Sequence, residues 1–224
     1  MDKKELFREK ISEIHSELPP GANLLIVSKT QSESDIRLYY DLGQRDFGEN
    51  RVQELQEKAQ ALQVTCPEIR WHMIGHLQSN KINQLLKIPG LAAIHSVHDR
   101  QLVDLLVSSQ VRLPRPVDVF LQFNTSKENE KSGFVTYTDL RMAADSLVKC
   151  TRLKLVGLMT MGTLRTENFE AEAARCFQEL TVEKEKLQSE FNIQLLTSMG
   201  MSQDYKIALR ERSNWIRLGS MMFN

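Results

Sequence analysis

The chain has 224 residues and carries 29 lysine and arginine residues against 29 aspartate and glutamate residues, so its formal net charge is zero. This balance argues against a broad basic surface that would bind nucleic acid or an acidic membrane. Hydrophobic residues make up 41% of the chain and charged residues 26%, which is enough apolar material for a sizeable core. We expect one domain over residues 1–224, because α/β barrels commonly have about 200–250 residues.

Membrane, secretion and metal signals are missing from the sequence. The apolar run 24–27 is far shorter than the roughly 20 residues that a membrane span needs, and residues 1–5 mix charges instead of opening a secretory signal. Cys66, Cys150 and Cys176 are an odd number without a close pair, so they indicate neither a disulfide framework nor a zinc site. We therefore expect a cytoplasmic protein that binds no metal.

The hydrophobic pattern predicts short strands separated by longer helical stretches. The predicted strands are 24–28, 45–48, 69–74, 91–97, 117–123, 153–160, 194–198 and 215–218. A helix over 3–17 precedes them, and the connecting helices are predicted at 32–42, 51–62, 79–86, 99–110, 138–147, 167–191 and 202–212. Four residues occupy N-cap positions, where a side-chain oxygen accepts a backbone N–H: Ser32, Ser79, Asp99 and Ser202.

This alternation of strands and helices predicts a single (β/α)8 TIM-type barrel with an additional N-terminal helix. Alternating elements require parallel strands with right-handed crossovers, and eight strands is the number that closes such a barrel. A doubly wound open sheet is the alternative, but no Gly-x-Gly-x-x-Gly pattern follows the first predicted strand.

Lys29 is the most informative single position. It ends the run that begins at Leu24, which places its amine at the C-terminal mouth of the barrel, where barrel enzymes hold reactive groups. We expect this amine to be partly desolvated. Since desolvation disfavours the ammonium form, some neutral amine becomes available to attack an aldehyde. The product would be a Schiff base. A surface lysine after an ordinary strand is the alternative.

Small residues follow the last two predicted strands, where barrels often bind phosphate through backbone N–H groups. The residues suited to this task are Gly200, Ser202, Gly219 and Ser220. Arg217 lies two residues before Gly219, so on an extended segment the two face the same side. The alternative is that the glycines only make tight turns and that Arg217 pairs with a carboxylate outside the barrel. Together with Lys29, the pattern indicates a ligand with an aldehyde and a phosphate, such as pyridoxal 5'-phosphate.

A set of segments in order along the chain makes this indication specific. With them, the chain resembles the pyridoxal phosphate homeostasis proteins, which are single-domain relatives of the N-terminal barrel of bacterial alanine racemases. The matching segments are Val27 to Thr30, Phe47 to Glu54, Trp71 to Lys81, Asn124 to Gly133, Gly157 to Gly162, Ser198 to Ser202 and Arg217 to Ser220. Two positions depart from the family pattern: the segment 221–224, where relatives usually continue with glycine, and Lys206, where they commonly carry an acidic residue.

The resemblance implies that pyridoxal 5'-phosphate is the cofactor and that Lys29 holds it as an aldimine. It implies that four residues lie around the phosphate: Ser198, Gly200, Gly219 and Ser220. It also implies that Arg217 approaches the pyridine nitrogen; since arginine stays protonated, the ring nitrogen would remain largely unprotonated and a weaker electron sink. Asn50, after the second strand, is a further candidate cofactor neighbour, with a helix cap as the alternative.

The implied function is to carry or buffer pyridoxal phosphate for intracellular vitamin B6 homeostasis. Racemisation needs a second base on the opposite cofactor face, which in the racemase relatives is a tyrosine from another domain of a partner subunit. Tyr205 is the only tyrosine that the sequence places near the mouth, and a packing or surface role fits it better.

Two enzyme alternatives remain at this stage. The first is a pyridoxal-phosphate-dependent racemase or related amino-acid enzyme, and the second is an aldolase-type barrel that uses Lys29 on a sugar phosphate. For the carrier we expect a monomer whose partners are apo-enzymes that receive the cofactor and free amino acids, with no nucleic acid and no membrane.

Overall fold

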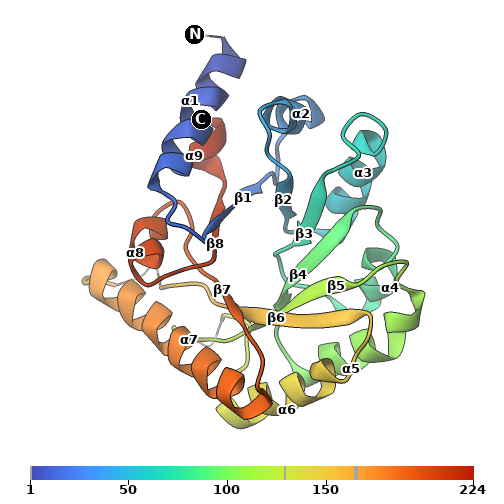
Figure 1. Cartoon of the computed structure of the whole chain (residues 1–224), viewed down its shortest axis with the longest axis vertical. Helices are drawn as coiled ribbons and strands as arrows, with labels where there is room; N and C mark the ends of the chain where they lie inside the picture. Colours follow the sequence, from blue (N-terminus) through green and yellow to red (C-terminus); the bar gives the residue numbers. More distant parts are fainter. Residues whose placement is uncertain (1, 129, 164–165) are drawn as a thin grey trace.

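Eight parallel strands form a closed barrel in chain order, and β8 pairs with β1 to complete it (Figure 1). The computed structural model describes residues 2–128, 130–163 and 166–224. The predicted (β/α)8 barrel is confirmed, and the open-sheet alternative is wrong. The strands are β1 (Asn23–Val27), β2 (Asp46–Glu49), β3 (Arg70–Met73), β4 (Leu91–Val97), β5 (Val117–Gln122), β6 (Leu153–Met159), β7 (Leu196–Ser198) and β8 (Trp215–Leu218).

Helices connect the strands and cover the outside of the barrel. The predicted N-terminal helix is α1 (Lys3–Glu17). The α-helices that follow are α2 (Glu33–Asp41), α3 (Val52–Leu62), α4 (Ile82–Leu85), α5 (Arg100–Ser109), α6 (Tyr137–Val148), α7 (Phe169–Phe191), α8 (Tyr205–Arg210) and α9 (Ser220–Phe223). Short 3₁₀ turns lie at η1 (Ser79–Lys81) and η2 (Gln110–Arg112). Within the described ranges, no helix combines the length and the apolar character that crossing a bilayer requires.

Two of the four predicted helix caps are confirmed. The side chains of Ser32 and Asp99 accept the backbone N–H groups of residues 35 and 102, at 3.2 and 2.7 Å. The predicted caps at Ser79 and Ser202 are wrong, because Gln78 and Asp204 hold the N-cap positions of η1 and α8. At Asp204 the carboxylate Oδ1 accepts the N–H of residue 201 at 2.5 Å, so the chain stays in a turn until α8 begins.

The short helix α9, which the sequence pattern did not predict, packs beside α1, and both lie at one end of the molecule in Figure 1. Nζ of Lys10 donates to the carbonyl of Met221 at 2.7 Å, and the hydroxyl of Tyr39 donates to the carbonyl of Met222. Phe7 stacks on Tyr39 with ring centroids 4.4 Å apart. Contacts from α1 and α2 therefore fix the segment that follows β8.

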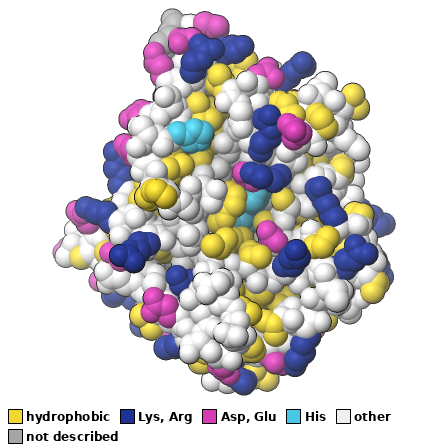
Figure 2. All heavy atoms as spheres, viewed as in Figure 1, with side chains coloured by type: hydrophobic (Ala, Val, Ile, Leu, Met, Phe, Trp, Pro, Cys, Tyr) yellow, Lys and Arg dark blue, Asp and Glu magenta, His cyan; other side chains and the backbone are white. Residues whose placement is uncertain are grey.

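The surface carries charges of both signs, as the zero net charge predicts. Figure 2 shows lysine and arginine side chains interspersed with aspartate and glutamate over one face, without a continuous basic area. Cys66, Cys150 and Cys176 are free thiols.

At the mouth of the barrel, the loop after β3 packs directly on the loop after β2. A Cβ atom added to Gly75 would lie 2.2 Å from the carbonyl oxygen of Asn50 and 2.6 Å from its Cα. Real Cβ atoms do not come so close to backbone, so only glycine fits at this position without moving one of the two loops.

We predict that Gly75→Ala lowers the free energy of unfolding by about 3 kcal/mol, at the upper end of typical overpacking costs. Urea unfolding followed by circular dichroism measures this change. The control is Gly43→Ala: Gly43 has φ +99° with no atom within 4 Å of an added Cβ, so only backbone strain of about 1 kcal/mol applies. Equal costs for the two variants would contradict the contact between the loops.

Candidate functional site

A cavity of about 420 Å³ opens at the C-terminal ends of the strands, a size that suits a small-molecule ligand. Its walls come from residues far apart in the sequence, which the closed barrel brings together. The lining residues are Val27, Lys29, Asn50, Ile74, Gly75, Met159, Met161, Met201, Ser202, Arg217, Gly219 and Ser220. The lining combines apolar side chains with an amine, a guanidinium and two hydroxyls.

The Glu49–Lys58 ion pair holds the backbone just before Lys29. Glu49 is fully buried, and its Oε1 accepts from Nζ of Lys58 and from the hydroxyl of Ser28, both at 2.7 Å. Nζ of Lys58 also donates to the carbonyl of Ser28 at 2.7 Å. Burial raises the pKa of Glu49, although the hydrogen bonds from Lys58 and Ser28 oppose the rise. The residue before Lys29 is therefore held on both its side chain and its carbonyl.

Lys29 itself is exposed at the rim of the cavity. It lies in the turn beyond β1, which ends at Val27, and the partial desolvation of its amine stays a prediction. Its side chain forms no hydrogen bond or ion pair with the described part of the chain, which leaves the amine accessible to a ligand in the cavity.

Arg217 lies on β8 with 4% of its surface exposed. Its Nη1 donates to Oγ of Ser198 at 2.8 Å, and its Nη2 donates to the carbonyl of Thr160 at 2.9 Å. Burial lowers the pKa of Arg217 to about 10, and the charge of Asp204 opposes the shift. The guanidinium therefore stays charged at neutral pH.

Within the described ranges, no carboxylate oxygen lies within ion-pairing distance of Arg217. The alternative in which this arginine pairs with an outside carboxylate is therefore wrong. A buried cation held by neutral acceptors alone retains an attraction for an acceptor or an anion in the cavity.

Backbone and hydroxyl donors gather around the loops after β7 and β8. Ser202, Gly219 and Ser220 line the cavity, and in the described ranges their amide N–H groups donate to no protein acceptor. The hydroxyls of Ser202 and Ser220 likewise have no partner there. Uncommitted N–H and O–H donors of this kind suit the oxygen atoms of a phosphate.

Ser198 and Gly200, which the resemblance placed around the phosphate, lie behind the cavity instead of lining it. The hydroxyl of Ser198 is fully buried between Arg217 and His95, at 2.8 Å from each. Gly200 has φ +95°, and an added Cβ would lie 2.6 Å from the Cβ of Ala208 on α8. Its carbonyl accepts the N–H of Arg217 at 2.9 Å, so both residues contact the arginine and not the cavity space.

Asn50 lines the cavity, next to Gly75. Its alternative reading as a helix cap is wrong, because Arg51 holds the N-cap position of α3. The sequence did not reveal the apolar part of the lining, to which Ile74, Met159 and Met161 contribute. The available signal was one methionine at the end of the sixth predicted strand and another two residues later.

The histidines near the site do not form a metal centre. Nε2 of His72 lies 3.0 Å from Oδ1 of Asp46, and its Nδ1 lies 2.9 Å from Nε2 of His95. Nδ1 of His76 lies 3.1 Å from Oγ of Ser132. In the described part of the chain, no group of three or more potential ligand side chains is arranged to hold a metal ion.

Comparison with known proteins identifies the family. Residues 4–224 match the family described as alanine racemase, N-terminal domain. The human pyridoxal phosphate homeostasis protein is 38% identical over 207 residues, which cover 89% of this chain and 75% of that protein. Its Schizosaccharomyces pombe counterpart of the same name is 34% identical over 215 residues, covering 94% and 89%.

Solved structures agree with this family. PipY of Synechococcus elongatus, solved without pyridoxal 5'-phosphate (PLP), has a TM-score of 0.89 at 34% identity, covering 97% of this chain and 100% of PipY. PipY with PLP bound has a TM-score of 0.86 at 33% identity, with the same coverage. Alanine racemase of E. faecalis shares the fold alone, at a TM-score of 0.72 and 15% identity over 99% of this chain and 58% of the racemase. The chain therefore belongs to the family of pyridoxal phosphate homeostasis proteins, within the larger group built on the alanine racemase N-terminal barrel.

Proposed function

We propose that this protein binds pyridoxal 5'-phosphate in the cavity at the barrel mouth, covalently through Nζ of Lys29. The observation that carries the proposal is the convergence of an accessible amine, a buried guanidinium and free backbone amides on one cavity. PipY, which is 33% identical to this chain, has been solved with PLP bound, and the curated relatives are named for pyridoxal phosphate homeostasis.

The donors around the cavity fit the three functional parts of this cofactor. When bound, pyridoxal phosphate supplies an aldehyde that condenses with a primary amine, and Lys29 is the primary amine on the lining. Ser202, Gly219 and Ser220 suit the phosphate, because their amides donate to no protein acceptor in the described ranges. Arg217 suits the ring nitrogen, to which it would donate a hydrogen bond without giving up its proton.

In this proposal Ser198 and Gly200 act through Arg217 and do not touch the phosphate. Asn50 would be a neighbour of the cofactor, because it lines the cavity. The lining methionines and Ile74 would pack on the cofactor and exclude water from it.

We infer that the protein carries or buffers the cofactor and does not turn over an amino acid. Lys29 and Arg217 are the only ionisable side chains among the cavity-lining residues in the described ranges, and Arg217 does not release a proton near neutral pH. Tyr205, the candidate second base, donates its hydroxyl to Glu17 at 2.9 Å and lies off the cavity lining. Burial raises the pKa of Tyr205, and Glu17 raises it further.

The carrier proposal includes a single domain, a monomer and a cytoplasmic location. Its partners are apo-enzymes that accept the cofactor and free amino acids whose amines compete with Lys29. The enzyme alternative, a racemase-like activity, is supported by the alanine racemase fold and by a lysine that is able to move a proton on one side of the cofactor.

We predict that borohydride reduction of the loaded protein fixes pyridoxal phosphate on Lys29, because its amine has no protein partner in the described ranges. Peptide mapping by mass spectrometry identifies the modified residue. Lys29→Ala should lose the adduct and the visible absorption of the attached cofactor. Lys149→Ala, which removes an exposed lysine of α6's C-terminal end, should keep both. An adduct on another lysine with Lys29 unmodified contradicts the proposal.

We predict that the loaded protein racemises L-amino acids at a rate within about tenfold of free pyridoxal phosphate, because inversion at Cα needs a second acid or base on the opposite face. A positioned acid or base typically contributes about 10²–10⁴-fold, and the described cavity offers no second one. The same protein should restore activity to an apo-aminotransferase. Sustained racemisation over many turnovers, abolished by Lys29→Ala, would establish the enzyme alternative instead.

A further inference from the structure

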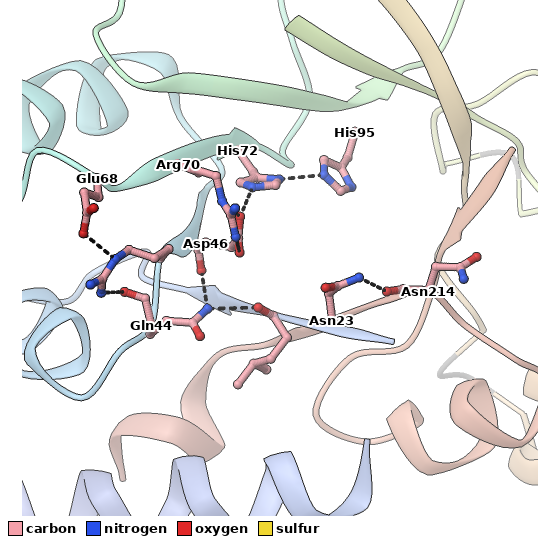
Figure 3. Close-up of polar contacts among 10 residues, drawn as sticks. Asn23, Gln44, Asp46, Glu68, Arg70, His72, His95 and Asn214 are labelled. Atoms are coloured by element: carbon pink, nitrogen blue, oxygen red, sulfur yellow. Dashed lines mark hydrogen bonds and ion pairs between the residues drawn. The ribbon is translucent and has the colours of Figure 1, made fainter. Parts of the chain in front are cut away.

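A continuous row of hydrogen bonds crosses the inside of the barrel and ends on Arg217. It begins on β2, where Oδ1 of Asp46 lies 3.0 Å from Nε2 of His72 on β3. Nδ1 of His72 lies 2.9 Å from Nε2 of His95 on β4 (Figure 3). Nδ1 of His95 lies 2.8 Å from Oγ of Ser198 on β7, and this oxygen accepts from Arg217 on β8 at 2.8 Å. The row thus joins the two opposite ends of the barrel interior.

Every residue of the row is buried. His95 and Ser198 are fully buried, and His72 and Asp46 are 3% and 7% exposed. Buried polar atoms need hydrogen-bond partners, and each ring nitrogen of this row has its partner inside the row. The donors and acceptors must therefore alternate consistently from one end to the other.

Asp46 sets the direction of this alternation. Nε of Arg70 donates to its Oδ1 at 2.7 Å, and Nη2 of Arg70 donates to its Oδ2 (Figure 3). Burial alone would raise the pKa of Asp46, but the hydrogen bonds from His72 and Arg70 outweigh it and hold the pKa below the ordinary value. An ionised carboxylate only accepts hydrogen bonds, so Nε2 of His72 carries a proton.

The other end of the row fixes the remaining protons. Arg217 only donates, so Oγ of Ser198 accepts from it, and the hydroxyl proton of Ser198 has Nδ1 of His95 as its acceptor in the described ranges. His95 therefore carries its proton on Nε2 and donates it to Nδ1 of His72. Burial lowers the pKa of His95 well below its usual range, and the charge of Arg217 lowers it further, so His95 is neutral.

The groups packed against the two imidazoles leave this order undisturbed. Phe120 on β5 stacks on His95 at 4.2 Å between ring centroids, and Trp215 on β8 lies 5.2 Å from the ring of His72. Asp118 on β5 forms no hydrogen bond with His72 in the described ranges and pairs in register with Lys154 on β6. Burial raises the pKa of Asp118, and the charge of Lys154 opposes the rise.

We propose that this row, from Asp46 to Ser198, positions Arg217 in the cofactor cavity, with every donated proton pointing toward Asp46. The residues of the row are positioning residues, because none of them lines the cavity except Arg217 itself. The proton order is a property of the protein alone, whereas its effect on a bound cofactor rests on the proposed function.

Nuclear magnetic resonance of histidine-labelled protein without added cofactor tests the proton order directly. Long-range ¹H–¹⁵N spectra at pH 7 should show both His72 and His95 as neutral rings with the proton on Nε2, exchanging slowly with solvent. A proton on Nδ1 of either ring, or an imidazolium at pH 7, would overturn the proposal.

Two variants with one matched control test the coupling along the row. Asp46→Asn should give mixed tautomers at His95, since an amide both donates and accepts, and Ser198→Ala should shift the Nδ1 resonance of His95 and the Nε resonance of Arg217. Ser96→Ala should shift neither, because Ser96 lies next to His95 on β4 and its buried hydroxyl has no partner in the described ranges. Unchanged resonances in both row variants would also overturn the proposal.

The loaded protein then tests the consequence for the cavity. Ser198→Ala should weaken pyridoxal phosphate binding by about tenfold, the loss expected for one hydrogen bond to a charged group, and should change the pH dependence of the cofactor spectrum at matched occupancy. Ser96→Ala should change neither property. If the resonances confirm the row but wild-type protein binds no pyridoxal phosphate, the proposed function fails and the positioning row stands. If cofactor binds but Ser198→Ala leaves its affinity and spectrum unchanged, the positioning role fails.

Discussion

Burial of the Arg217 guanidinium is the constraint on which the candidate site depends. A buried cation costs several kcal/mol unless hydrogen bonds compensate it, and the described chain offers this one only neutral acceptors, Ser198 and Thr160. The interior of such barrels is usually filled by branched aliphatic side chains. Here His72, His95 and Ser198 occupy part of it, because the arginine needs an oriented acceptor.

The mouth of the barrel is held by contacts that lie outside the cavity itself. The Glu49–Lys58 pair fixes the backbone before Lys29, and the close approach of Gly75 to Asn50 joins the loops after β2 and β3. On the other side, α1 and α2 hold the segment after β8 through its carbonyls. The amine is thus without a protein partner in the described ranges, while the backbone that carries it is fixed.

Strand order and the barrel could be predicted from hydrophobic spacing, because each element buries its own apolar face. Lys29, Arg217 and Gly219 could be placed near the mouth because they lie at or just beyond the carboxyl ends of strands. The distinction between Ser198 behind the cavity and Ser202 on its lining could not, since it depends on which way the loop after β7 turns. The row through His95 escaped prediction because its partners lie on strands that only barrel closure brings together.

The most direct test of the account is a crystal structure of the protein grown with pyridoxal phosphate. We predict electron density continuous between Nζ of Lys29 and the cofactor, with the phosphate on the amides of Ser202, Gly219 and Ser220 and the ring nitrogen at hydrogen-bond distance from Arg217. Cofactor bound elsewhere on the chain, or bound here with Arg217 out of contact, would contradict the account.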